Sequence, residues 1–455
     1  MRMAVFGTGY LGATHAASMA ELGHEVLGID VDEAKIARLA KGEVPFFEPG
    51  LPEILRRHVD SGLLRFTTDY SEAAEFADLF FIGVGTPQRK GDFAADTTYV
   101  EAVVTELAPR LTRSAVIVGK STVPVGTAQR LQEAADRLTP EGVRLEVVWN
   151  PEFLREGYAV KDTLEPDRVV VGVANPDAEP TFGRERLLEA YEPILSAGLT
   201  DEQREAGETA TPLIITDLAT AELVKVSANA FLATKISFIN AVSEVCEAAG
   251  ADVTVLADAI GMDKRIGRRF LGAGLGFGGG CLPKDIRAFM ARAGELGADQ
   301  ALTFLREVDA INMRRREKMV QLAVDTMGGS LIGSSVAVLG AAFKPDSDDV
   351  RDSPALNIAG MLSLKGAQAV VFDPQALENS RRLYPTLGYA DSALGACEGA
   401  DLVIIATEWK EFVALDPREV AAVARGRIVL DGRNCLPRER WEDAGFEYRA
   451  LGRGR

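Results

Sequence analysis

The sequence predicts an α/β fold, with two Rossmann-like, doubly wound domains joined by a central helical domain that contains a long bridging helix. Short apolar runs alternate with helical stretches in residues 1–205 and again in 328–455, as in parallel sheets with crossover helices. Residues 206–327 instead hold two long helical stretches. With 455 residues the chain is long enough for three domains, and these three ranges are the limits that we expect.

Composition narrows the class of protein. Hydrophobic residues make up 47% of the chain and charged residues 26%, as in an ordinary globular protein. The net charge of −17 argues against a nucleic acid or an anionic membrane as partner. We expect no signal peptide and no bilayer-spanning run. The cysteines have neither metal-ligand nor disulfide spacing, so we expect no metal site and a reducing cytoplasm: Cys246, Cys281, Cys397 and Cys435.

The first predicted nucleotide site lies at the N-terminus. Gly7, Gly9 and Gly12 form a G-x-G-x-x-G pattern between an apolar strand and a helix, and the next strand ends at Asp30. In this pattern the glycines permit the tight turn, the approach of a pyrophosphate and close helix–strand packing. Asp30 is expected to accept hydrogen bonds from the adenosine ribose, which favours NAD over NADP. The alternative is a glycine-rich turn that binds no nucleotide.

Three more apolar runs continue the first sheet, at 77–87, 115–124 and 144–153. Ligands of such sheets sit at the carboxyl ends of the strands. The polar segment 88–98 is either a lid over the site or a plain surface loop. Polar side chains at the strand ends are therefore candidates for the site: Thr86, Ser121, Thr122, Asn150 and Glu152.

The middle of the chain begins with a long predicted helix, 217–250, without proline or internal glycine. Lys225, Asn229, Ile236 and Asn240 fall within about 60° of one another around its axis. They form either a polar wall of a cleft or a solvated face. The apolar residues around them favour the cleft. Residues 304–327 predict the second long helix, which bridges to the third domain.

A glycine-rich loop precedes a single cysteine. Six of the nine residues before Cys281 are glycine, which lets backbone N–H groups approach a bulky anionic or sugar ligand. Pro283 suits the first turn of the helix that is expected to follow. A helix N-terminus favours thiolate, so the loop predicts covalent chemistry by Cys281 on a bound substrate.

The last third predicts four strands, at 334–343, 368–374, 400–407 and 426–433, and its first turn lacks the dinucleotide pattern. Lys344, Arg351 and Arg433 stand at strand ends, where they suit phosphates, although each alone is more often a surface charge.

Elimination limits the acid–base groups. The three histidines, His15, His24 and His58, all lie in the first domain, so a His–Asp dyad in a separate substrate domain is not available. Proton transfer is left to Lys225, Asp285, Glu152, Glu156 or water.

Nine motifs along almost the whole chain resemble the nucleotide-sugar dehydrogenase family, and 264–285 resembles its UDP-glucose branch most. One departure is Gly280, where the family usually has serine. The motifs are GTGYLG, EPGL from Glu48, STVPVGT, NPEFLREG, the run 225–240, AIGMDKRIGRRFL, GFGGGCLPKD, GAAFKPDSDDVRDSP and LDGRN.

The resemblance implies oxidation of a sugar C6 alcohol in two steps with two NAD. Cys281 would attack the aldehyde to give a thiohemiacetal, then a thioester that water cleaves. Lys225 and Asn229 would stabilise the oxyanion, Asp285 and Thr122 would position water or accept the proton, and Glu152 would serve in acid–base roles. Which carboxylate is the base at each step stays open.

The resemblance also implies two binding sets and a homodimer built by the central helices, with Arg265 reaching a neighbouring subunit's substrate. The NAD set is Gly7, Gly9, Tyr10, Leu11, Gly12, Asp30, Lys35, Thr86, Thr122, Glu156, Lys284 and Arg351. The nucleotide-sugar set, with UDP-glucose preferred, is Glu152, Phe153, Leu154, Lys225, Asn229, Arg265, Phe270, Phe277, Gly278, Phe343, Lys344 and Arg433.

Two other functions stay open. One is a dehydrogenase of another nucleotide sugar, such as TDP-glucose or GDP-mannose. The other is a nucleotide-sugar sensor that keeps the fold and has lost catalysis. The sensor is disfavoured because Cys281, Lys225, Asn229 and Asp285 are all present.

Overall fold

The computed structural model describes residues 1–454, which form two compact units, Met1–Ala228 and a second that begins at Asn229. The boundary falls inside one helix, α10 (Leu218–Ala249). The division into three domains that the sequence predicts stays a proposal.

The first unit is built on an eight-stranded sheet in the order β3-β2-β1-β4-β5-β6-β7-β8. The first six strands pair in parallel, whereas β6 and β7 pair antiparallel and β7 and β8 pair in parallel. The strands are β1 (Arg2–Phe6), β2 (Glu25–Ile29), β3 (Leu64–Thr67), β4 (Leu79–Ile82), β5 (Ala115–Gly119), β6 (Leu145–Trp149), β7 (Val169–Val173) and β8 (Leu213–Asp217).

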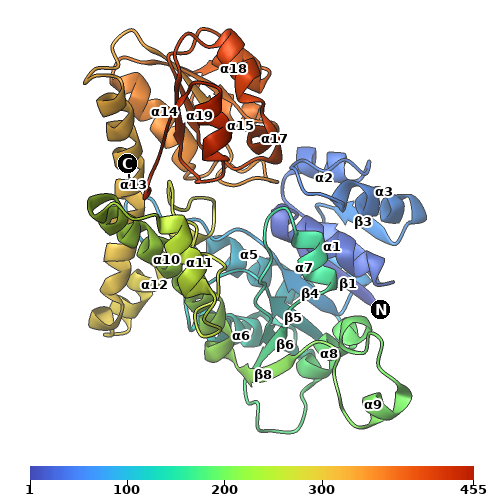
Figure 1. Cartoon of the computed structure of the whole chain (residues 1–455). Helices are drawn as coiled ribbons and strands as arrows, with labels where there is room; N and C mark the ends of the chain where they lie inside the picture. The colour runs from blue at the N-terminus through green and yellow to red at the C-terminus, as the bar shows by residue number, and fades with distance from the viewer. Residues whose placement is uncertain (455) are drawn as a thin grey trace. The chain divides into compact units, whose positions relative to one another are not determined.

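Helices cover both faces of this sheet (Figure 1). Ala4 and Phe6 of β1 face a core shared with α4, α5 and α6, while Met3 and Val5 face a core shared with α1, α3 and α8. The helices are α1 (Tyr10–Glu21), α2 (Glu33–Leu39), α3 (Leu51–Ser61), α4 (Tyr70–Phe76), α5 (Thr98–Leu107), η1 (Ala108–Arg110), α6 (Thr127–Leu138), α7 (Ala159–Leu164), α8 (Phe182–Leu195) and α9 (Asp201–Glu205).

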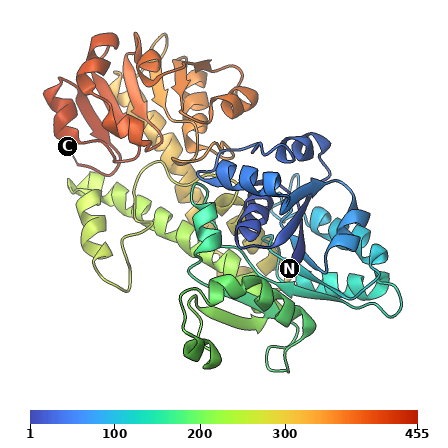
Figure 2. The ribbon, with the colours of Figure 1, turned by 90° about the vertical axis from the view of Figure 1, so that its right-hand side faces the viewer.

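The second unit combines helices with a six-stranded parallel sheet in the order β11-β10-β9-β12-β13-β14, drawn orange to red in Figure 2. Its strands are β9 (Ser335–Leu339), β10 (Gln368–Phe372), β11 (Gly388–Tyr389), β12 (Leu402–Ile405), β13 (Ile428–Asp431) and β14 (Glu447–Ala450). After α10 the helices are α11 (Val253–Gly261), α12 (Leu282–Glu295), η2 (Asp299–Leu302), α13 (Phe304–Thr326), α14 (Pro354–Leu364), α15 (Leu377–Leu383), α16 (Ala393–Cys397), α17 (Lys410–Ala414), α18 (Pro417–Val423) and α19 (Arg438–Asp443).

The predicted fold class is confirmed, because two Rossmann-like sheets and a central helical region are all present. The short apolar runs of the sequence correspond to β1, β2, β4, β5, β6, β9, β10, β12 and β13. The sequence did not reveal that β6 and β7, which are consecutive strands, pair antiparallel, because the apolar residues of a buried strand do not indicate its direction. Within residues 1–454 no helix is long and apolar enough to cross a membrane.

Candidate active site

The N-terminal glycine turn has the shape that a dinucleotide needs. Gly7 has φ +87°, and a Cβ there would lie 2.7 Å from a Val84 methyl group, so only glycine fits. A Cβ on Gly12 would lie 1.7 Å from the Gly7 carbonyl oxygen. Gly9 instead has open space where its Cβ would point, and it is the N-cap of α1. The backbone around Gly9 is therefore accessible to a phosphate group at a helix N-terminus, close to half-buried Tyr10 and Leu11.

Asp30 directly follows β2 and is joined to Lys35. Its Oδ2 accepts hydrogen bonds from the Thr8 backbone N–H at 2.8 Å and from Lys35 Nζ at 2.9 Å. Burial opposes ionisation, but these hydrogen bonds outweigh it and lower the pKa of Asp30. A permanent carboxylate at this place can accept from ribose hydroxyls and repel a 2′-phosphate. The residues present thus fit NAD.

The loops after β4 and β5 are tied to each other. Thr86 donates a hydrogen bond of 2.7 Å to the Thr122 carbonyl, and Ser121 donates one of 2.7 Å to the Val84 carbonyl. Glu222 of α10 accepts from two backbone N–H groups at the start of α6, Gly126 at 2.6 Å and Ala128 at 2.7 Å. The segment that carries Thr122 is thereby fixed to the helix that carries Lys225.

Buried Lys225 and half-buried Glu152 form an ion pair, 2.9 Å between Nζ and Oε1. The other oxygen of Glu152 accepts a hydrogen bond of 2.6 Å from the Leu154 backbone N–H. The Phe153 ring lies under two cations, with Lys225 Nζ 5.8 Å and the Arg168 guanidinium 3.7 Å from its centroid. Half-buried Glu156 lies farther along the same segment. These side chains form one cluster of predicted site residues within the first unit.

A buried lysine, Lys120, directly follows β5 and interacts electrostatically with both members of this pair. Lys120 Nζ is 2.8 Å from Asn150 Oδ1 and 3.0 Å from the Tyr191 hydroxyl, and Asn150 in turn donates to the Val170 carbonyl at 2.7 Å. Burial lowers the pKa of Lys120 to about 8, with the charge of Glu152 acting in the opposite direction. The sequence placed Asn150 at a strand end but did not single out Lys120.

The second unit brings Asn229 and Asp285 together. The Asn229 side-chain amide donates to Asp285 at 2.6 Å, and Lys284 Nζ lies 2.5 Å from the other carboxylate oxygen. Both Asn229 and Asp285 are buried. Asn240, about three turns along the same helix, accepts from the Gly274 backbone N–H at 2.9 Å. The polar line on α10 is therefore not a solvated face.

Cys281 differs from the other cysteines in its surroundings. It is exposed and is the N-cap of α12, where Asp285 N–H donates to its carbonyl oxygen. Cys246 and Cys397 are buried, and burial raises the pKa of the Cys397 thiol to about 12. Burial also raises the pKa of half-buried Cys435, together with the negative charge of Asp431. Within the described residues Cys281 is the cysteine best placed to act as a nucleophile.

The glycines before Cys281 are required by close packing. Gly276 and Gly279 have φ +85° and +83°, and a Cβ on Gly279 would lie 2.9 Å from the Phe343 ring. A Cβ on Gly278 would lie 2.4 Å from the Asp352 carbonyl oxygen. A Cβ on Gly280 would lie 2.2 Å from the guanidinium carbon of Arg351. The loop is therefore pressed against the segment that follows β9.

Buried polar side chains of α13 hold this loop, and the sequence did not reveal them. Asn312 accepts from the Phe277 N–H at 2.7 Å and donates to its carbonyl at 2.9 Å. Arg315 donates to the Gly274 carbonyl at 3.0 Å, and Arg316 pairs with Asp352 at 2.8 Å. A run of charged residues on a helix usually indicates a solvated face. The spacing of Asn312, Arg315 and Arg316 could have indicated a shared role, because it puts them on one side of α13.

Arg433, just after the end of β13, also binds the glycine loop. It donates to the carbonyl groups of Gly276 at 3.0 Å and Phe343 at 3.2 Å. Arg351 pairs with Asp349 at 2.7 Å, and Lys344 Nζ lies 5.6 Å from the Phe343 ring centroid. Arg433, Phe343, Phe277 and Gly278 are thus brought together.

Arg265 and Phe270 are predicted site residues at the surface of the second unit. Arg265 is exposed and pairs with Asp263 at 2.6 Å, and Phe270 is exposed with φ +65°.

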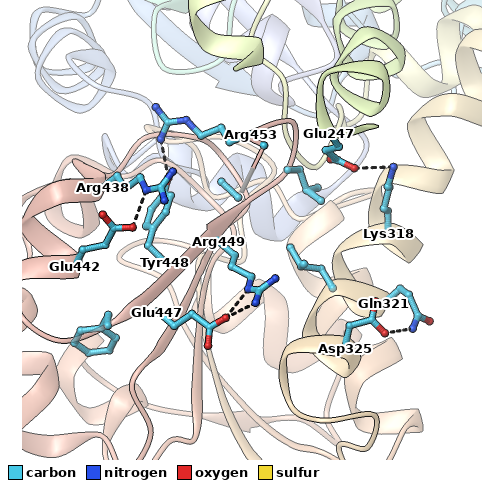
Figure 3. A pocket seen from close by; sticks show the side chains of 15 residues that line it. Glu247, Lys318, Gln321, Asp325, Arg438, Glu442, Glu447, Tyr448, Arg449 and Arg453 are labelled. Atoms are coloured by element: carbon cyan, nitrogen blue, oxygen red, sulfur yellow. Dashed lines mark hydrogen bonds and ion pairs between the residues drawn. The ribbon is translucent and has the colours of Figure 1, made fainter. Parts of the chain in front are cut away.

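A pocket of about 530 Å³ lies elsewhere in the second unit (Figure 3). Its charged side chains pair among themselves, for example Lys318 with Glu247 at 2.9 Å and Arg438 with Glu442 at 2.7 Å. No predicted site residue lines it, so we do not assign the reaction to it. Its lining comprises Glu247, Lys318, Gln321, Leu322, Asp325, Arg438, Glu442, Phe446, Glu447, Tyr448, Arg449, Ala450, Leu451, Arg453 and Gly454.

Three family models match the chain. They are the NAD binding domain of the UDP-glucose/GDP-mannose dehydrogenase family over residues 1–195, its central domain over 219–314 and its UDP binding domain over 337–438. A UDP-glucose 6-dehydrogenase of Rhizobium meliloti is 40% identical over 100% of both chains. The UDP-glucose 6-dehydrogenase YwqF of Bacillus subtilis is 38% identical over 100% of this chain and 98% of its own. A UDP-glucose dehydrogenase structure from Pyrobaculum islandicum matches with a TM-score of 0.87 and 36% identity, covering 100% of this chain and 98% of its own.

Proposed function

This chain belongs to the UDP-glucose/GDP-mannose dehydrogenase family, an NAD-dependent group that oxidises nucleotide sugars, and we propose that it oxidises UDP-glucose to UDP-glucuronate. The observation that carries the proposal is the environment of Cys281, an exposed thiol at the start of α12 beside the buried Asn229–Asp285 pair. The preference for UDP-glucose over TDP-glucose or GDP-mannose is supported by the relatives' names.

In the proposed reaction NAD, when bound, accepts one hydride in each of two oxidations. The first converts the C6 alcohol to an aldehyde with loss of a proton. Cys281 adds to the aldehyde carbon as thiolate, and the oxygen that becomes negative is stabilised by Lys225 and Asn229. These two residues are four positions apart on α10, so the helix presents them on one side.

The second oxidation turns the thiohemiacetal into a thioester, and water then cleaves it to the acid and restores the thiol. In this step the Asp285 carboxylate, with Thr122, orients the water or accepts its proton. Lys284 and Asn229 hold the Asp285 side chain in one orientation. Glu152, paired with Lys225, is proposed as the acid–base group that supplies and removes protons at the sugar oxygen.

Nucleotide-sugar binding is proposed for Phe153, Leu154, Phe277, Gly278, Phe343, Lys344 and Arg433. Among these residues, Arg433 has the best-defined contacts, because it donates hydrogen bonds to the carbonyl groups of Gly276 in the glycine loop and of Phe343. Arg265 and Phe270 are exposed and are proposed to act across a subunit interface. Glu156, Lys284 and Arg351 are proposed to contact NAD.

A homodimer through the central helices is part of the proposal. Phe231, Phe238 and Val245 of α10 recur every seven residues and are 66%, 53% and 66% exposed. Val255 and Met262, in and just after α11, are 66% and 81% exposed. Large apolar side chains in such a row indicate a protein interface. A cytoplasmic location also remains a proposal, which the absence of disulfides among the described cysteines supports.

A panel of UDP-glucose, TDP-glucose and GDP-mannose, followed by NADH absorbance, tests the function. The proposal expects the highest kcat/KM with UDP-glucose. Turnover of another sugar alone would contradict the substrate, and no NADH with any sugar would favour a sensor.

A further inference from the structure

Glu48 is a buried carboxylate to which the mechanism above gives no role. It is 2% exposed and lies between α2 and α3. Its two oxygens each accept a hydrogen bond of 2.7 Å, from the backbone N–H groups of Gly157 and Ala159. Ala159 is the first residue of α7, so Glu48 satisfies amide groups that the helix itself leaves without partners. Without these donors a carboxylate so deeply buried would be strongly destabilising.

A third donor comes from the dinucleotide turn. Tyr10 is the first residue of α1, directly after Gly9, and its hydroxyl donates to Glu48. The same hydroxyl accepts a hydrogen bond of 3.0 Å from the Gly157 N–H. The Tyr10 ring packs against Phe46 at a centroid distance of 5.0 Å. Burial and the Glu48 charge raise the pKa of Tyr10, so its hydroxyl remains a donor.

The segment that Glu48 holds leads directly to Glu152. Gly157 has φ +79°, and Arg155 is fixed by a hydrogen bond of 2.8 Å from its Nε to Asp162 of α7. At the other end, Glu152 accepts from the Leu154 N–H and pairs with Lys225. Both ends of this short segment are thus anchored.

We propose that Glu48 is a positioning residue that links the NAD turn to the nucleotide-sugar segment, with the Tyr10 hydroxyl as the connecting group. The proposal rests on the proposed function, because Glu152 and Phe153 are assigned to the sugar nucleotide there. Glu48 could cap α7 without Tyr10, and the hydroxyl brings the first turn of α1 into the same cluster. Binding at one site then favours the arrangement that the other site requires, and this coupling is reciprocal.

The test is the coupling between two ligands that cannot react with each other, NADH and UDP-glucose. Calorimetry on the full chain gives the Kd of UDP-glucose without NADH and at saturating NADH, and the ratio of the two is the coupling factor. Because both Kd values come from the same variant, an effect of the substitution on the affinity for UDP-glucose itself cancels in this ratio. The variants are Tyr10→Phe, which deletes only the hydroxyl, and Glu48→Gln, which keeps the size. The control is Tyr99→Phe, at an exposed tyrosine of α5.

We expect a coupling factor of at least five for the wild type and for Tyr99→Phe, and less than two for Tyr10→Phe and Glu48→Gln. A wild-type factor of one, or a Tyr10→Phe variant that keeps the wild-type factor, would overturn the link while the proposed function stands. A wild type that binds NADH but not UDP-glucose would overturn the proposed function, and the link between these two ligands with it.

Discussion

Asn229 and Asp285 are joined by a buried hydrogen bond of 2.6 Å between the side-chain amide of one and the carboxylate of the other. They come from different helices, α10 and α12, and Asp285 lies one turn after Cys281. Lys284 binds the second oxygen of Asp285 at 2.5 Å. The carboxylate is therefore held in place near the start of the helix on which the cysteine lies.

Asp285→Asn is expected to lower kcat at least about a hundredfold, because the neutral amide can neither accept a proton nor pair with Lys284. Steady-state measurements of NADH absorbance give kcat, and a thermal melt checks that the variant is folded. Glu295→Gln, at an exposed acid of the same helix, is the control and should keep wild-type turnover. Wild-type kcat in Asp285→Asn would exclude this carboxylate from the chemistry.

Asp30→Ala is expected to weaken NAD binding by about 1.5–3 kcal/mol through the loss of a charge-assisted hydrogen bond. It should also narrow the preference for NAD over NADP, because Lys35 loses its partner and becomes available to a 2′-phosphate. The double variant Asp30→Ala/Lys35→Ala should bind NAD more weakly than the wild type, without the improved binding of NADP. Titration with both cofactors checks this, with Glu25→Ala at the other end of β2 as control. An unchanged NAD affinity would show that Asp30 is not the ribose ligand.

Lys120 predicts a pH dependence of stability. Its pKa is lowered by burial to about 8, below the ordinary value of 10.5, so between these pH values the unfolded chain binds more protons than the folded one. The contribution of Lys120 to the free energy of unfolding therefore rises with pH from about 8 to 10.5, by up to about 3 kcal/mol. Below pH 8 this contribution is lost, because the lysine is charged in both states.

The difference in unfolding free energy between wild type and Lys120→Met isolates this contribution. Urea unfolding at pH 7 and pH 10 gives the free energy of unfolding of each protein. The value for the wild type minus that for Lys120→Met should be more positive at pH 10 than at pH 7. A difference that is the same at both values would mean that Lys120 titrates near its ordinary pKa.

The row of exposed apolar residues on α10 predicts the effect of charge on assembly. Phe231→Glu/Phe238→Glu places two carboxylates in the proposed interface, where like charges face each other, so the dimer should dissociate. Sedimentation velocity should show the mass of two chains for the wild type and of one for the variant. Leu364→Glu, at an exposed leucine of α14, should stay dimeric. A dimeric double variant would place the interface elsewhere.

Much of the fold could be predicted because most of the central strands of both sheets are buried on both faces. The run of β5 is apolar throughout, those of β1 and β6 contain one charged residue each, and all three lead into polar or glycine residues. A second group of features could be predicted because each depends on residues near in sequence. These are the glycine turn, the position of Asp30 after a strand, and the helix start at Leu282 directly after Cys281.

The remainder depends on contacts between distant residues. Asn312 and Arg315 hold the glycine loop from a helix whose charged sequence is typical of a solvated face. Glu48 and Glu222 each accept two backbone N–H groups from segments about a hundred residues away, 109 and 111 for Glu48 and 96 and 94 for Glu222. No local period marks such partners, so only the folded chain reveals them.

The central claim is covalent catalysis by Cys281, and the Cys281→Ala variant tests it most directly. We measure UDP-glucuronate at steady state and NADH per sugar consumed, with Cys246→Ala as the control at a buried cysteine. The wild type and the control should form two NADH per sugar and release the acid, whereas Cys281→Ala should form no acid yet still bind NAD. Acid formation by Cys281→Ala at near the wild-type rate would contradict the covalent mechanism.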